Sequence, residues 1–300
     1  MAVGTTGVTP AANFNPTIWI PEVSDAAKAN TVLATLVDRS FEDNMRMGRI
    51  AAIQDFSNPA VRIKTEDTSA TYSNITESQD TITVSRQAYC AFLVEDIEDV
   101  QAHIDLRQRY TDNTGYSLMA FIEGDATSGL MSLPQNFSNL VGTLGSDPTV
   151  DTLIDAKSNL DRADAPQDDR FIYVSPGFHN ALLKQAMLAS SDFRGSSAVE
   201  SNRNGQIMGP VYGAKMAVST LAINSPAVSG QAYGFFCHKR GVALIIQRDV
   251  RVHEQYILLE TGTGVLADVI YQFAERNIAT KALGGGARDD KFNCALRGPA

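Results

Sequence analysis

The sequence predicts an α+β protein, because strand-like and helix-like patterns occupy separate stretches of its 300 residues. Apolar and polar residues alternate at 61–64 and again at 80–86, which is typical of half-buried strands. Residues 95 to about 124 begin with an acidic run and repeat apolar residues at helical spacing, which predicts one long helix. Residues 147–188 indicate a helix, a buried strand and a second helix built around a sheet.

The composition is ordinary for a folded chain, with 44% hydrophobic and 20% charged residues. No stretch approaches the roughly 20 apolar residues that span a bilayer, so we expect no membrane partner. The first ten residues show neither the charged start nor the apolar run of a secretory signal. Cys90, Cys237 and Cys294 lack metal-binding spacing, and their odd number favours free thiols in a reducing cytosol.

The formal net charge is −9, with 34 acidic against 25 basic residues. A protein that binds nucleic acid tightly and specifically concentrates basic residues on one face, because phosphate contacts dominate its affinity. Lys and Arg are scattered here, which argues against that class. An acidic surface that faces nucleic acid would leave the polymer mobile through weak, screened repulsion.

Residues 1–50 are predicted to form an N-terminal arm, which is extended up to about residue 25 and contains a short helix at 25–37. Prolines punctuate the first 25 residues, and proline favours extended backbone because it fixes one dihedral angle and removes a donor. The arm carries the single Trp of the chain, a residue that favours burial. We expect the arm to order against a neighbouring subunit through Phe14, Ile18 and Trp19.

Residues 51–94 are predicted to form an extended hairpin, in which two alternating strands flank the polar stretch 66–79. A two-stranded hairpin is marginally stable alone in water, so this one is expected to lean on another subunit. The residues expected to make that contact are Val61, Arg62, Ile63, Lys64, Tyr72, Ile82 and Val84.

Two helices are predicted within residues 147–188, because a capping residue is followed by proline at Asp147–Pro148 and again at Ser175–Pro176. Strands are expected at 171–175, 215–220 and 232–238. The Gly-, Ser- and Asn-rich stretch between the second helix and the second of these strands is long enough to indicate a functional or mobile loop.

The last part of the chain is predicted to begin with a long strand, or a bent pair of strands, at 243–260. Residues 265–283 are compatible with either strand or helix. Residues 284–300 are predicted to be a flexible tail.

The run TLIDAKSNLDRADAPQDDRFIYVSPGFHNALLK and the later IMGPVYGAKMAVST resemble the corresponding regions of the major capsid proteins of tailed bacteriophages. In that family a helix ending in a Leu-Asp-x-Ala turn precedes a strand that ends in Ser-Pro. The order of parts is also similar to the Hong Kong 97-like fold. The resemblance implies an arm at 1–50, an extended hairpin at 51–94, a spine helix and peripheral domain at 95–146, an axial domain at 147–242, a return to the peripheral domain at 243–283 and a tail at 284–300.

The resemblance implies a structural protein and no enzyme. Pentamers and hexamers of the chain would form the icosahedral shell of a virion around non-specifically packaged double-stranded DNA. Scaffolding protein and portal would be partners, and assembly would occur in the cytoplasm of the host bacterium. The hairpin would lie over the spine helix of the adjacent subunit. Loop 190–214 would lie near the capsomer centre, through Phe193, Arg194 and Arg203.

Some family members cross-link a hairpin lysine to an asparagine. Lys64 and Asn277 are conceivable partners here, but the sequence does not supply the carboxylate base. We therefore expect Lys64 to form a surface ion pair with a neighbouring subunit.

Enzymatic alternatives have weaker support in the sequence. His103, His179, His238 and His253 lack zinc-site spacing, and His179 is expected to be exposed in the first turn of a helix. Cys237 is expected to be a buried small hydrophobe, since it and the next residue point to opposite faces of a strand.

The acidic run 161–169 and the glycines at 262–264 match no calcium-binding or phosphate-binding loop. We expect no catalytic residue, metal or cofactor. A nanocompartment shell protein of the same fold remains the main alternative, and a hydrolase a weaker one.

Overall fold

The computed structural model describes residues 32–46, 48–56, 59–75, 77–95, 106–127, 133, 137, 139–143, 145–189, 210–221, 234–276 and 292–298. The chain divides into two compact units. The smaller unit combines 1–30, 87–119 and 248–270, and the larger combines 31–86, 120–247 and 271–300. Among the described residues, no helix is long and apolar enough to cross a membrane.

The larger unit contains a five-stranded sheet in the order β4-β10-β7-β5-β6. These strands are Leu140–Val141, Asn293–Leu296, Gly234–His238, Arg170–Val174 and Lys215–Val218. β5 runs antiparallel to β7 and parallel to β6, and β10 runs antiparallel to β7. Every residue of β5, β7 and β10 is buried, which explains their unbroken runs of apolar residues.

β10 corrects the expected flexible tail. Residues 293–296 form a fully buried strand between β4 and β7. The preceding Gly- and charge-rich residues suggested a tail, but Phe292, Cys294 and Leu296 carry the apolar side chains that the sheet core needs. The segment is too short to show a strand pattern without its neighbours.

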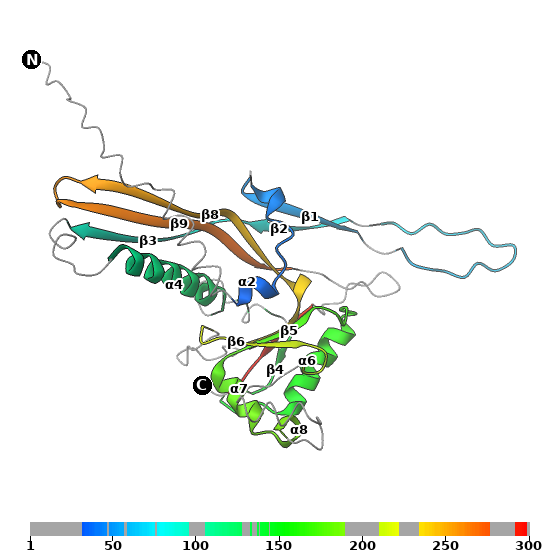
Figure 1. Cartoon of the computed structure of the whole chain (residues 1–300). Helices are drawn as coiled ribbons and strands as arrows, with labels where there is room; N and C mark the ends of the chain where they lie inside the picture. Colours follow the sequence, from blue (N-terminus) through cyan, green and yellow to red (C-terminus); the bar gives the residue numbers. More distant parts are fainter. Residues whose placement is uncertain are drawn as a thin grey trace, which may run out of the picture. The chain divides into compact units, whose positions relative to one another are not determined.

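Helices α6 (Val150–Arg162), α7 (Pro176–Leu183) and α8 (Ala186–Ala189) accompany this sheet (Figure 1). α6 buries Val150, Leu153, Ala156 and Leu160 in the same core as Ile172 of β5.

The beginning of α7 is capped as expected, since the Ser175 hydroxyl accepts a hydrogen bond from the Phe178 amide at 3.3 Å. The expected cap of α6 at Asp147 is wrong. Thr149 caps that helix in a reciprocal capping box with Thr152.

A three-stranded sheet has the order β3-β9-β8, with strands Arg86–Glu95, Gly262–Glu275 and Val242–Ile257. The long strand expected at 243–260 is confirmed, and the ambiguous segment from 265 is resolved as strand.

α4 (Leu106–Thr127) is the described part of the predicted long helix and continues past Gly124. Residues 96–105, where its acidic start was expected, lie outside the described residues. The short elements α2 (Leu33–Leu36), η1 (Asp43–Met45) and η2 (Lys239–Gly241) complete the described structure.

The predicted hairpin is present, but its first strand lies earlier in the chain than expected. β1 (Ile50–Phe56) pairs antiparallel with β2 (Glu77–Thr83), from Ile50↔Thr83 to Phe56↔Glu77. The strand expected at 61–64 is wrong. The described pairing of the hairpin ends at Phe56↔Glu77, and residues 59–65 lie in no strand, because alternation of apolar and polar residues does not by itself supply a paired strand.

Neighbouring positions on α6 give a test of this packing. Leu153 is fully buried whereas Ile154 is 43% exposed. We expect Leu153→Ala to lower the free energy of unfolding by about 2–5 kcal/mol, because it leaves a cavity. Ile154→Ala should change it by less than about 0.5 kcal/mol, as surface substitutions usually do. Urea unfolding followed by circular dichroism measures both, and equal losses would contradict the described packing of α6.

Candidate assembly surfaces

The connection between β1 and β2 exposes apolar side chains along its whole described length. Val61, Ile63 and Tyr72 are 87%, 95% and 94% exposed. Arg62 and Lys64 between them are exposed as well. The backbone of residues 59–75 makes one local turn, in which the Thr68 amide donates to the Thr65 carbonyl at 3.3 Å. This segment, hereafter the hairpin loop, is drawn as a long thin connection in Figure 1. It therefore has no apolar core of its own.

Two residues expected to contact a neighbouring subunit are instead buried within the chain. Ile82 is 1% and Val84 is 5% exposed. The Val84 amide also donates to the Arg49 carbonyl at 2.9 Å. The side chains of Ile82, in β2, and of Val84, just after it, therefore lie in the chain's own interior.

The other expected contact residues lie outside the described residues. They are Phe14, Ile18 and Trp19 of the arm, Phe193, Arg194 and Arg203 of the loop assigned to the capsomer centre, and the conceivable cross-linking residue Asn277.

The three-stranded sheet is tied together by a buried carboxylate that the sequence did not reveal. Asp268 of β9 is fully buried and accepts hydrogen bonds from Arg251 of β8, at 2.5 Å from Nε and 2.9 Å from Nη2. It accepts a third from Gln87 Nε2 of β3 at 2.5 Å. The bonds from Arg251 hold the pKa of Asp268 below its usual value, although burial opposes them. One ionised side chain thus joins all three strands.

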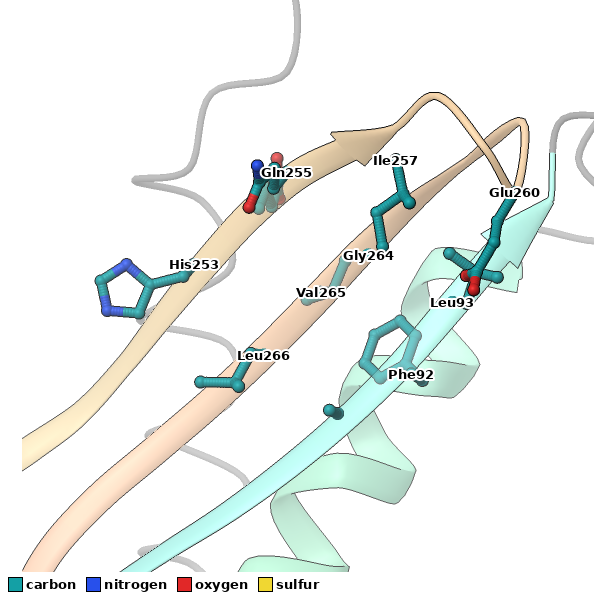
Figure 2. A pocket seen from close by; sticks show the side chains of 11 residues that line it. Phe92, Leu93, His253, Gln255, Ile257, Glu260, Gly264, Val265 and Leu266 are labelled. Carbon is teal, nitrogen blue, oxygen red and sulfur yellow. The ribbon is translucent and has the colours of Figure 1, made fainter.

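The same sheet carries a hollow of about 810 Å³, lined by residues of β3, β8 and β9 (Figure 2). Its lining is mainly apolar, including Leu93, Ile257 and Leu266 around Gly264. Glu260, at the turn between β8 and β9, lies on its rim. Of the described residues that line it, none is Lys or Arg. Beside it, Leu258 and Leu259 of the turn are 82% and 97% exposed.

Two buried carboxylates at the C-terminal end of α4 join it to neighbouring strands of the larger unit. Glu123 is fully buried and accepts a hydrogen bond from the Tyr173 hydroxyl of β5 at 2.5 Å. Asp125 accepts one from the Tyr271 hydroxyl of β9 at 2.9 Å and pairs with Arg86 at 3.4 Å. Burial, reinforced by the adjacent carboxylate, raises the pKa of each tyrosine. Both tyrosines therefore remain protonated donors at neutral pH.

Two of the residues considered for catalysis, Cys237 and His179, are buried inside the protein. Cys237 is fully buried, and burial raises the pKa of its thiol, which disfavours the nucleophilic thiolate. His179 corrects an expectation, because it is 4% exposed rather than solvent-facing. It lies on the buried side of α7, next to Phe178, and burial lowers its pKa.

The acidic run holds ion pairs, since Asp161 lies 2.6 Å from Arg170 and 2.5 Å from Lys157. Within the described ranges, no three His, Cys, Asp or Glu side chains group closely enough to hold a metal ion.

Comparison with known proteins links this architecture to virus shells. No family model matches the chain. The major capsid protein of Enterobacteria phage T3 is 28% identical over 127 residues, which cover 34% of this chain and 36% of that protein. The chain thus spans about a third of the curated relative that it matches.

Solved structures are similar over most of the chain. A capsid structure of the cyanophage P-SCSP1u has a TM-score of 0.67 at 16% identity, covering 89% of this chain and 88% of that one. A structure from Mycobacterium phage Che8 has a TM-score of 0.66 at 19% identity, covering 89% and 91%. The fold is that of phage capsid proteins. The expected α+β class and the resemblance to this fold are thereby confirmed.

The phage capsid fold explains why a long helix, a long three-stranded sheet, a hairpin and a separate five-stranded sheet occur in one chain. The local sequence could indicate the hairpin and the helix. The sequence gave no indication of the hollow or of the contacts that Asp268 makes with Gln87 and Arg251, because Gln87 is 181 residues from Asp268 in the chain. No motif of fixed spacing reports such a distant pair.

The buried charge of Asp268 should make the free energy of unfolding depend on pH. Because its folded pKa is depressed, ionised Asp268 stabilises the fold above its unfolded pKa of about 3.9, and this stabilisation is lost as pH falls through the folded pKa. We therefore expect Asp268→Asn to lower the free energy of unfolding at neutral pH, and the difference from wild type to shrink below about pH 4.

Urea unfolding between pH 3 and 7 measures this difference. Asp249→Asn, on the exposed part of β8, is the matched control and should show a smaller, flat difference. A difference for Asp268→Asn that did not vary with pH would contradict the role of its charge.

Proposed function

We propose that the chain is a major capsid protein, which assembles with copies of itself into the icosahedral shell around the genome of a tailed double-stranded DNA phage. The hairpin loop carries this proposal, because it holds fully exposed apolar side chains on an extended segment. An isolated molecule gains nothing from such a segment. Neighbouring copies in a shell would cover it, and the likeness to phage capsid structures supports that setting.

The parts of the chain are assigned to capsid domains as follows. Residues 1–50 would be the arm, 51–94 the extended hairpin, 95–146 the spine helix and peripheral domain, 147–242 the axial domain and 243–283 the return to the peripheral domain. The five-stranded sheet supports the axial assignment, since β5, β6 and β7 all fall within 147–242. β10 belongs to that sheet, so we assign 293–296 to the axial domain rather than to a tail.

The energetics of the hairpin loop favour assembly through modest contacts. Full burial of a Val or Ile side chain contributes about 1.5–3 kcal/mol, so Val61 and Ile63 of each copy would together add about 3–6 kcal/mol before the cost of ordering the loop. Contacts of this kind are heterologous, joining different surfaces of adjacent copies, and they close into rings when the rotation permits. Many weak contacts allow errors to be corrected during growth and still stabilise a complete shell.

The charge of the chain suits a shell that encloses DNA without binding it tightly. A net charge of −9 leaves packaged DNA mobile through screened repulsion. In this proposal scaffolding protein and portal are further partners, assembly takes place in the cytoplasm of the host bacterium, and the virion is the final location. The role is structural rather than enzymatic.

Electron microscopy of the purified protein tests the proposal. We expect closed icosahedral particles. Small discrete oligomers with a measurable hydrolytic activity would contradict it, and particles filled with an enzyme rather than nucleic acid would indicate the nanocompartment alternative.

Shortening the hairpin loop tests its part in assembly. We expect a chain lacking residues 61–74 to keep its fold, because β1 and β2 retain their register and the remaining residues suffice for a hairpin connection. It should yield few or no closed particles, since the apolar residues that a neighbour would cover are gone. Circular dichroism and particle counts measure the two effects. Wild-type yields of closed particles from this variant would remove the loop from the mechanism.

A further inference from the structure

The short turn η2 joins β7 to β8, and one buried histidine caps it. His238, the last residue of β7, is 5% exposed. Its ring nitrogen Nδ1 accepts a hydrogen bond from the Arg240 amide at 3.2 Å, which caps the beginning of η2. A ring nitrogen that accepts a hydrogen bond carries no proton, so the ring that makes this cap is neutral and has its proton on Nε2.

η2 is also held by the segments around it. The Lys239 amide donates to the Asp169 carbonyl at 3.0 Å, and the Arg276 amide donates to the Gly241 carbonyl at 2.9 Å. Gly241 packs so closely that a Cβ there would overlap Oδ1 of Asn293. The capped turn therefore contacts the loop before β5, the residue after β9 and the beginning of β10.

The surroundings of the His238 ring favour its neutral form. The ring packs edge to face against Phe292, with centroids 5.6 Å apart. Two arginines and two aspartates act on the ring, namely Arg240 of η2, Arg170 of β5, and Asp168 and Asp169 of the loop before β5. Both aspartates are exposed, so water screens their attraction to a charged ring. Burial first, and then the charge of Arg240, therefore lower the pKa of His238.

We propose that His238 is a pH-sensitive lock on η2, which the neutral ring keeps closed and the protonated ring opens. Protonation places a hydrogen on Nδ1, so the Arg240 amide loses its acceptor. It also leaves a positive charge buried beside Phe292, which is costly without a close partner. Detachment of η2 relieves both, because the ring and the amide then reach water. The inference goes beyond the proposed function, since η2 is part of the folded chain in any state of assembly.

The direction of the pH effect follows from the neutral ring. The pKa of His238 is lower in the folded chain than in the unfolded chain, so the unfolded chain binds the proton at higher pH. The stabilisation is complete above the unfolded value of about 6.5 and is lost as the pH falls through the folded value. η2 should therefore be closed in mildly alkaline solution and open in mildly acidic solution.

Hydrogen exchange of η2 tests the lock. His238→Asn keeps a capping acceptor that does not titrate, since asparagine is among the best helix caps. Peptides that cover residues 239–242 are followed by mass spectrometry at about pH 7.5 and about pH 5, on either side of the usual histidine pKa. After correction for the intrinsic exchange rate, we expect wild-type protection to fall about fivefold or more at the lower pH, and that of His238→Asn to change less than about twofold.

His179→Asn is the matched control. His179 is also buried and also has a lowered pKa, but it lies on α7. This variant should keep the wild-type fall in the protection of residues 239–242. The same fall in His238→Asn as in wild type would overturn the lock, and so would wild-type protection that does not change with pH.

Titration of the ring in the wild-type chain is a second measure that needs no variant. Exchange of the imidazole C2 hydrogen, followed by mass spectrometry, gives a midpoint for each histidine. We expect the midpoint of His238 below the ordinary histidine value of about 6.5. The protection of residues 239–242 should fall with that same midpoint. A His238 midpoint at or above the ordinary value, or a fall in protection with a different midpoint, would contradict the lock.

Discussion

The structure depends on a single constraint, which is that the hairpin loop cannot bury its own apolar side chains. Val61, Ile63 and Tyr72 lie on a segment with no second strand, helix or core beside them in the described chain. Exposure of apolar side chains to water is unfavourable, and the local turn at 65–68 leaves these side chains exposed. The remaining features become coherent if another copy supplies the missing contact. On the proposed function, such a chain would complete its folding by associating with other copies.

Contacts within the chain hold together the two larger sheets of the described residues, as a building block requires. The five-stranded sheet and α6 share a buried apolar core, and Asp268 joins the three strands of the second sheet. Glu123 and Asp125 connect α4 to tyrosines of β5 and β9. A buried carboxylate with well-placed hydrogen-bond partners favours one arrangement of the strands and helix around it, because breaking the pair leaves a buried charge without a partner.

Local sequence patterns predicted the elements that carry their own signals. The Ser175 cap, the buried strand at 170–174 and the burial of Cys237 followed from residue types at fixed spacing. The strand expected at 61–64 was wrong because alternation alone does not supply a pairing partner. β10 was missed because four residues become a strand only between β4 and β7. The hollow depends on three strands that are distant in the chain, so no local pattern could indicate it.

The most direct measurement is a cryo-electron-microscopy reconstruction of an assembled particle, in which the surroundings of the hairpin loop can be seen. We expect Val61 and Ile63 to be covered by residues of an adjacent copy. A reconstruction in which both side chains remain in solvent, or pack onto their own chain, would contradict it.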